Sequence, residues 1–214
     1  MLMNYIKSIS TISIEIRSEM MNKEFIDIVK NKFDEEINEN ILNNIKNLGK
    51  EKIFKKGELI LRIGDPMKKT YFILKGIARS YYLDMQGNDV TKTFTKEYDF
   101  CIGESLFTNS RSEEGFEALE DIIALEFDAK ELKKYFFSEK VLIDIYIKKL
   151  EETLIYKMNR ENAFQIKSAT ERYLEFKRNH SDIEERVNQA YIASYLGVSP
   201  VSLSRIRRAI RDEY

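Results

Sequence analysis

Three segments of the chain place apolar residues at steps of three and four, which is the spacing of an amphipathic helix. The first, residues 22–48, ends before Gly49 and predicts one or two helices. The second, residues 139–161, predicts a long helix, and the third, residues 165–177, predicts a further helix followed by a polar stretch. The long helix carries one apolar stripe, formed by Ile143, Ile147, Leu150, Leu154 and Met158. An exposed helix with a single apolar seam usually pairs with something, and we expect this one to form a symmetric dimer rather than to pack only on its own domain.

Between the first two helical segments, residues 52–128 consist of short β-rich pieces separated by turn residues. The candidate strands are residues 53–54, 59–62, 71–74, 77–83, 90–95 and 122–127. Turns that recur every 8 to 12 residues or so are typical of an antiparallel roll or barrel. A parallel α/β sheet is disfavoured, because no helix of crossover length interrupts the pattern.

The C-terminal stretch VNQAYIASYLGVSPVSLSRIRRAIR, residues 187–211, predicts two short helices that meet at one glycine. Gly197 suits the end of the first helix, since a left-handed backbone position is free of strain only for glycine. Ser199 is placed to cap the second helix, and Pro200 falls at its first position, where a missing N–H does no harm. These signals together indicate a helix-turn-helix.

The second of these helices has a polar face that suits DNA. Ser202, Arg205 and Arg208 lie opposite Val201, Leu203 and Ile206. Short hydroxyls and guanidiniums are the groups that a helix in a major groove uses on phosphates and base edges. The net charge of −1 does not itself point to nucleic acid, but four arginines fall within residues 205–211. The alternative is an amphipathic terminal helix of a plain bundle with solvated arginines.

Composition places the chain among ordinary soluble, cytoplasmic proteins, with 33% charged and 43% hydrophobic residues. No apolar run approaches the 18 or so residues that a membrane span requires, so no membrane partner is expected. The opening residues do not read as a secretory signal. We expect residues 1–21 to be a loosely ordered N-terminal extension.

Enzyme chemistry is not indicated. Cys101 is the only cysteine and His180 the only histidine, so a disulfide, a structural zinc site and a cysteine-ligated cluster are excluded. No metal-ligand cluster, nucleophile elbow or phosphate-binding loop is present either. Cys101 follows Phe100 in a strand-like stretch, which favours a buried, inert thiol. The chain is therefore predicted not to be an enzyme and to carry no metal or other cofactor.

The order of these parts resembles the cyclic-AMP receptor/FNR superfamily of bacterial transcription regulators. The string KKGELILRIGDPMKKTYFILKGIARSYYLDMQGNDV, residues 55–90, is similar to that superfamily's cyclic-nucleotide-binding roll, and the likeness extends over about residues 25–211. The resemblance implies an α+β fold: an antiparallel β-roll, a long dimerisation helix and a winged helix-turn-helix. It implies a sensor region at residues 22–137, a dimerisation helix at 138–162 and a DNA-binding domain at 163–214. It also implies a homodimer that binds a near-palindromic duplex operator and acts on RNA polymerase.

The effector site matches the superfamily only in part. Gly103, Glu104 and Ser105 match the residues that lead into the short helix of cyclic-AMP-binding members, which also use an Arg-Ser or Arg-Thr pair on the phosphate. Here Glu113 and Glu114 stand where that pair is expected, and carboxylates repel a phosphate. Arg111, nearby, is the candidate substitute. We predict that cyclic AMP does not bind tightly and leave any other effector open.

For DNA contacts the resemblance supports Arg205 as the base-reading residue. Gln189, Ser199, Ser202 and Arg208 are expected to make phosphate or mixed contacts. The cysteine cluster of the FNR branch is absent, and the single histidine lies outside the sensor region. The alternative function is a ligand-binding module whose C-terminal helices dock a protein, which a weak dependence of duplex binding on salt would indicate.

Overall fold

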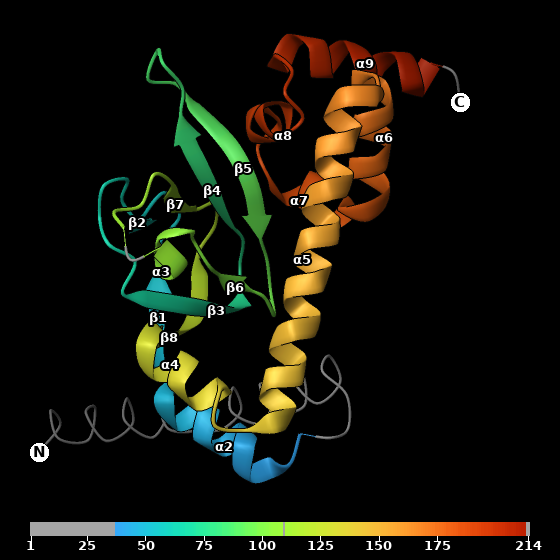
Figure 1. Cartoon of the computed structure of the whole chain (residues 1–214). Helices are drawn as coiled ribbons and strands as arrows, with labels where there is room; N and C mark the ends of the chain where they lie inside the picture. Colours follow the sequence, from blue (N-terminus) through green and yellow to red (C-terminus); the bar gives the residue numbers. More distant parts are fainter. Residues whose placement is uncertain (1–36, 109, 213–214) are drawn as a thin grey trace, which may run out of the picture.

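The computed structural model describes residues 37–108 and 110–212 (Figure 1). Its first part runs through α2 Glu39–Leu48, β1 Lys50–Phe54, β2 Leu59–Leu61, β3 Lys69–Lys75, β4 Ala78–Leu83, β5 Asp89–Thr95, β6 Phe100–Cys101, α3 Ser105–Thr108, β7 Gly115–Ala118 and β8 Ile122–Asp128. The helices α4 Ala129–Phe136, α5 Lys140–Ile166, α6 Ala169–Asn179, α7 Ser181–Arg186, α8 Gln189–Tyr195 and α9 Pro200–Asp212 follow. The expected helix over residues 22–36 and the extension at 1–21 lie outside the described residues.

The strands form two four-stranded antiparallel sheets, in the orders β1-β8-β3-β6 and β2-β7-β4-β5. Between them lies a core that includes Phe54, Ile73, Phe116 and Ile122. The predicted antiparallel roll is therefore confirmed. Cys101 is fully buried in this core, and burial raises the pKa of its thiol to about 12, as expected for an inert cysteine.

The C-terminal part is α-helical, which corrects one prediction. The described residues 129–212 contain helices and connecting segments but no strand. The prediction of a β-stranded wing beside the helix-turn-helix is therefore wrong for this part of the chain. The polar stretch at residues 178–185 instead contains most of α7, which buries Ile183. The long helix also runs on to Ile166, and α6 starts only after Ser168, which forms a capping box with Glu171.

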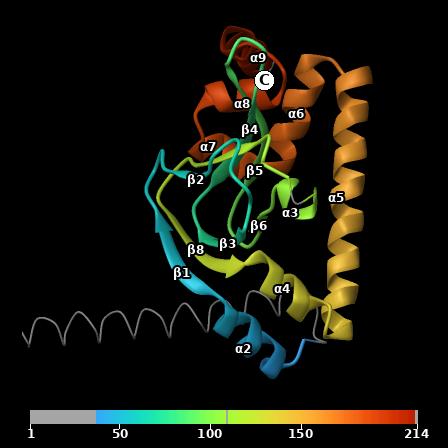
Figure 2. The ribbon, with the colours of Figure 1, turned by 60° about the vertical axis from the view of Figure 1, so that its left-hand side comes forward.

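Helices cover the roll at both ends (Figures 1 and 2). At one end α2 and α4 pack against β3 and β8, with Leu42, Phe72, Phe127 and Leu132 in a shared core that the start of α5 completes through Leu142. From there α5 passes along the side of the roll to α6 and α9 at the other end (Figure 1). The helix-turn-helix and α2 therefore lie at opposite ends of α5.

The middle of α5 is exposed. Its buried residues are Leu142 and Ala163, near its two ends, and residues 151–159 between them are all exposed. Among the apolar residues there, Leu154 is 60% and Met158 54% exposed. None of the helices within the described ranges is long and apolar enough to cross a membrane.

The C-terminal helices share a core with the roll. Ile77 and Leu119 of the roll pack with Tyr173, Phe176 and Ile192 of α6 and α8. Arg79 of β4 reinforces this contact: it is 3% exposed, it pairs with Asp89 and with Glu117 at 2.8 Å, and its guanidinium lies 3.8 Å from the ring centroid of Tyr191 in α8. A guanidinium is tolerated at such depth only when it is paired and hydrogen-bonded. The helix-turn-helix is thus docked on the roll.

Candidate nucleic-acid interface and effector site

The helix-turn-helix forms where the sequence places it. Gly197 has φ +68°, and Ser199 caps α9 by accepting the N–H of Ser202 at 3.1 Å. A Cβ on Gly197 would lie 2.7 Å from a ring carbon of Phe164, so glycine is required both by the backbone conformation and by the close approach of α5. Leu196 and Leu203 are buried beneath the turn and hold the two helices together.

The outer face of α9 presents unpaired positive charge. Arg205 is exposed and has no salt-bridge or hydrogen-bond partner among the residues that the structure describes. Arg208 is also exposed and lies 3.7 Å from Asp212, a surface pair of little strength. Arg207, by contrast, faces Glu184 at 3.6 Å. The helix therefore offers Arg205 and Arg208 outward.

The other three predicted DNA residues differ among themselves. The hydroxyls of Ser199 and Ser202 lie 2.9 Å apart at the start of α9, where they are engaged in the cap. Gln189 is half-buried: its amide donates to the carbonyl of Glu184 at 3.4 Å, and its own oxygen is buried. In this arrangement the side-chain amide of Gln189 is held against protein.

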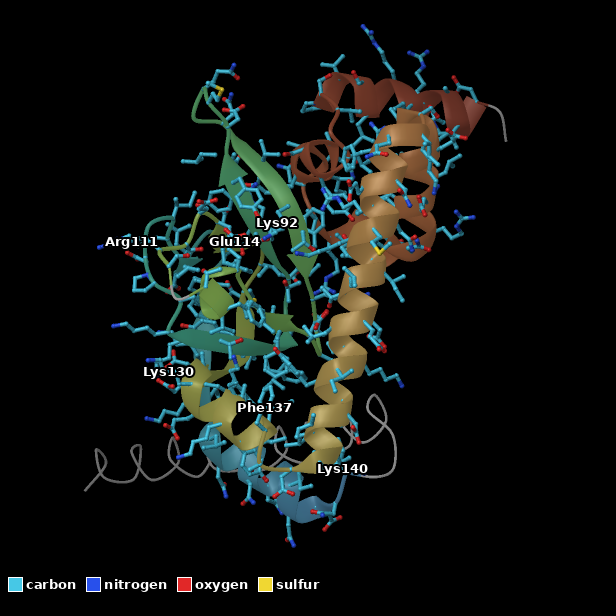
Figure 3. The ribbon with its side chains drawn as sticks, in the orientation of Figure 1. Lys92, Arg111, Glu114, Lys130, Phe137 and Lys140 are labelled. Carbon is cyan, nitrogen blue, oxygen red and sulfur yellow. The ribbon has the colours of Figure 1, made fainter. Side chains whose placement is uncertain are left out.

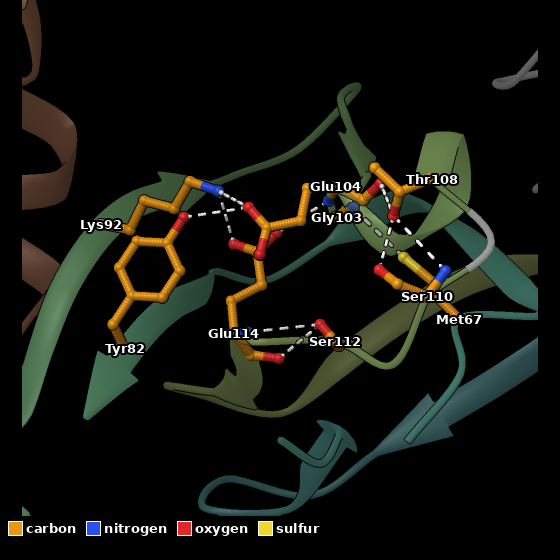
Figure 4. A network of polar contacts seen from close by, with 9 residues as sticks. All are labelled: Met67, Tyr82, Lys92, Gly103, Glu104, Thr108, Ser110, Ser112 and Glu114. Carbon is orange, nitrogen blue, oxygen red and sulfur yellow. Dashed lines mark hydrogen bonds and ion pairs between the residues drawn. The ribbon is translucent and has the colours of Figure 1, made fainter. Parts of the chain in front are cut away.

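The expected effector site is built around a buried carboxylate. Glu114, immediately before β7, is 1% exposed. One oxygen of its carboxylate accepts the backbone N–H of Glu104 at 3.0 Å, and the other accepts Nζ of Lys92 at 2.9 Å (Figure 4). Gly103 allows this approach, since a Cβ there would lie 2.9 Å from the same carboxylate. The backbone donor of Glu104, just before α3, is therefore met by the chain's own anion.

Lys92 joins this site from β5, the edge strand of the same sheet as β7 (Figure 4). Its ammonium lies 3.5 Å from Glu104 and 4.9 Å from the ring centroid of Tyr82, whose hydroxyl donates to Glu104 at 3.1 Å. Burial acts to lower the pKa of Lys92, but its hydrogen bonds to Tyr82 and Glu114 outweigh burial and raise the pKa above its ordinary value. The lysine is thus held charged beside Glu114.

Arg111 does not join the site. It is exposed, points outward and donates to the carbonyl of Gly64 at 2.8 Å (Figure 3). Gly103 and Glu104 are in place, whereas the side chain of Ser105 lies outside the described part of the structure. Glu113 and Glu114, which the sequence gives the same role, separate: Glu113 is exposed and only Glu114 is buried. In the described ranges no group of His, Cys, Asp and Glu side chains is arranged to hold a metal ion.

The sequence argument missed Lys92. Nothing near it in the chain marks it, because it reaches Glu114 only through the pairing of β4 with both β5 and β7. A buried glutamate needs a positive partner, so a search for a cation in the neighbouring strands that could balance the Glu113–Glu114 pair would have found Lys92.

Comparison with known proteins agrees with this geometry. Residues 51–139 match the family model of the cyclic nucleotide-binding domain. No curated protein matches the sequence significantly.

Several solved structures are similar. The c-di-GMP-responsive global regulator CLP of Xanthomonas campestris has a TM-score of 0.67 at 14% identity, over 82% of this chain and 93% of its own. FixK2 of Bradyrhizobium japonicum has a TM-score of 0.64 at 20% identity, over 77% and 85%. A CooA double mutant from Carboxydothermus hydrogenoformans has a TM-score of 0.67 at 16% identity, over 88% and 84%. Residues 51–139 are therefore similar to a cyclic nucleotide-binding domain, and the chain has the fold of these solved structures.

Proposed function

We propose that the protein is a homodimeric, sequence-specific DNA-binding transcription regulator that is not controlled by cyclic AMP. The observation that carries the proposal is the outward face of α9, on which Arg205 and Arg208 stand exposed on a glycine-hinged helix pair. Guanidiniums on an exposed helix can bind guanine edges and phosphates in a major groove. Regulators of similar fold, CLP and FixK2 among them, support the same reading.

The exposed stripe of α5 supplies the dimer in this proposal. A helix of 27 residues is roughly 40 Å long, and residues 151–159 in its central part are all exposed. We infer that a second copy packs on Ile143, Ile147, Leu150, Leu154 and Met158 and so places two α9 helices at the same end of the dimer. In this proposal the sensor region is residues 22–137, the dimerisation helix is 138–162 and the operator-binding domain is 163–214. RNA polymerase is the partner that the operator-bound dimer would then contact.

The first experiment selects duplexes from a randomised pool with the purified protein, without ligand, and follows binding of the selected duplex as salt is raised. We expect an enriched near-palindrome and an affinity that falls steeply with salt, since each neutralised phosphate releases counterions. Capture of a protein partner, with duplex binding that is weak and insensitive to salt, would instead indicate that the C-terminal helices dock protein.

Replacing Arg205 with alanine is expected to reduce discrimination against the wrong base by about 1–3 kcal/mol, because a bidentate contact to guanine is lost. Competition between the selected operator and single-base variants measures this loss. Arg178→Ala, which removes an exposed arginine from α6, is the matched control and should leave discrimination unchanged. If Arg205→Ala binds its operator as tightly and selectively as the parent, the assignment of Arg205 is wrong.

Cyclic AMP is expected not to bind tightly, because the buried Glu114 carboxylate already holds Lys92 and the N–H of Glu104. A phosphate brought there would meet a carboxylate with no excess positive charge to receive it. Titration calorimetry of the full chain with cyclic AMP tests this. Micromolar affinity would contradict the prediction and would require Glu114 to move.

A further inference from the structure

The outer edge of β5 is held by the C-terminal helices through its backbone. β5 is the edge strand of the sheet β2-β7-β4-β5, so its outward N–H and C=O groups have no neighbouring strand. The N–H of Thr91 donates to the hydroxyl of Ser194 in α8 at 2.9 Å. The carbonyl of the next residue, Lys92, accepts a hydrogen bond from Nη1 of Arg160 in α5. Two helices thus take the place of a strand.

Arg160 connects three elements with one guanidinium. Its Nη2 donates to the carbonyl of Tyr195, the last residue of α8, at 3.0 Å, and its guanidinium lies 4.1 Å from the Tyr195 ring centroid. The last carbonyls of a helix lack intrahelical partners and favour a cation. Arg160 therefore fixes the end of α8, two residues before the Gly197 turn, to the same point of β5.

Lys92 is the residue that the effector site and this junction share. Its side chain binds Glu114 and Glu104 within the roll, while its carbonyl binds Arg160 outside it. A shift of β5 that relaxes the Lys92–Glu114 pair also moves the carbonyl, and a hydrogen bond weakens steeply once its length and angle leave the normal range. The contacts that Arg79 and the N–H of Thr91 make with α8 involve neither Glu104 nor Glu114.

We infer that Arg160 is a positioning residue that transmits the state of the Glu114–Lys92 site to the helix-turn-helix. The inference rests on the proposed function and specifies its regulation. A change at Glu114 displaces Lys92, Arg160 then loses either the carbonyl of β5 or that of α8, and α9 turns relative to α5. The orientation of the two recognition helices in the dimer changes as a result.

A thermodynamic cycle tests this coupling. Glu114→Gln and Arg160→Met are made singly and together, and affinity for the selected duplex is measured at several salt concentrations. Each single variant is expected to bind about 10-fold more weakly, and the double variant no more weakly than Arg160→Met alone. The salt dependence should match the parent, since no phosphate contact is removed. Lys157→Met, at an exposed position of α5, is the control and should bind as the parent does.

Hydrogen exchange of the α8 amides gives a second readout that needs no DNA. Glu114→Gln should speed exchange at residues 192–196 several-fold in the parent and not at all in the Arg160→Met background. Arg160→Lys replaces Arg160→Met if the latter fails to fold, because one ammonium cannot reach both carbonyls with the same geometry. Effects that add in both measurements, or a reduced salt dependence for Arg160→Met, would overturn the inference. A parent that binds no duplex yet shows the coupling in exchange would count against the proposed function only.

Discussion

Replacing Leu154 with lysine is expected to convert the protein to a monomer and to weaken operator binding by about 100-fold or more. Leu154 is 60% exposed in the single chain and lies in the apolar stripe of α5, between Leu150 and Met158. In a symmetric dimer it would face its own copy, so the substitution brings two unpaired charges into an apolar seam. A monomer also loses the advantage of two linked half-site contacts, which is about 10²–10⁴ in affinity.

Light scattering of the eluting protein and duplex titration measure the two parts of this prediction. Glu152→Lys is the matched control, since it places a lysine on an exposed position of the same helix, on the side away from the stripe. It should remain a dimer. A Leu154→Lys protein that is still dimeric and still binds its operator would show that the stripe is not the interface.

Replacing Lys92 with methionine is expected to lower the free energy of unfolding by about 3 kcal/mol, because Glu114 is left as a buried charge with one backbone N–H for a partner. Urea unfolding at pH 7 measures the loss. Glu114→Gln in the Lys92→Met background should recover most of it, since the buried group is then neutral. Full stability of Lys92→Met on its own would mean that Glu114 is not charged in the folded protein.

A second lysine provides the control for this loss. Lys149 lies 3.5 Å from Asp99, and both side chains are about two-fifths exposed, at 39% and 41%. Exposed pairs of this kind contribute about 1 kcal/mol or less. Lys149→Met should therefore change stability far less than Lys92→Met does.

Turn residues and periodicity were enough to predict the fold class and most elements. Gly57, Gly64, Gly76 and Gly87 all have positive φ, so the turn residues between the candidate strands of the roll were correctly identified. The strand β7 was missed because three of its four residues are buried and it shows no alternation of polar and apolar positions. The short helix α7 was missed because a six-residue helix with one buried apolar residue carries no visible period.

The candidate site was predictable only where chemistry is local in sequence. The Gly197 turn follows from neighbouring residues, whereas Gly103 and Glu104 were found through the resemblance to the superfamily. The different exposures of Glu113 and Glu114 depend on a bend at these two residues immediately before β7, and no local pattern in the sequence marks that bend. Lys92 and Arg160 act through contacts with residues 22 and 68 positions away, respectively, and no local pattern carries such information.

The covered edge of β5 also bears on solubility. A fragment that ends after the roll would lack Ser194 and Arg160. The N–H of Thr91 and the carbonyl of Lys92 would then be free to pair with a strand of another chain. Uncapped edges of this kind recruit other chains and lead to aggregation. Selection against aggregation therefore acts on the same side chains that orient the helix-turn-helix. Protection of the strand edge and orientation of the helices constrain the evolution of these side chains together.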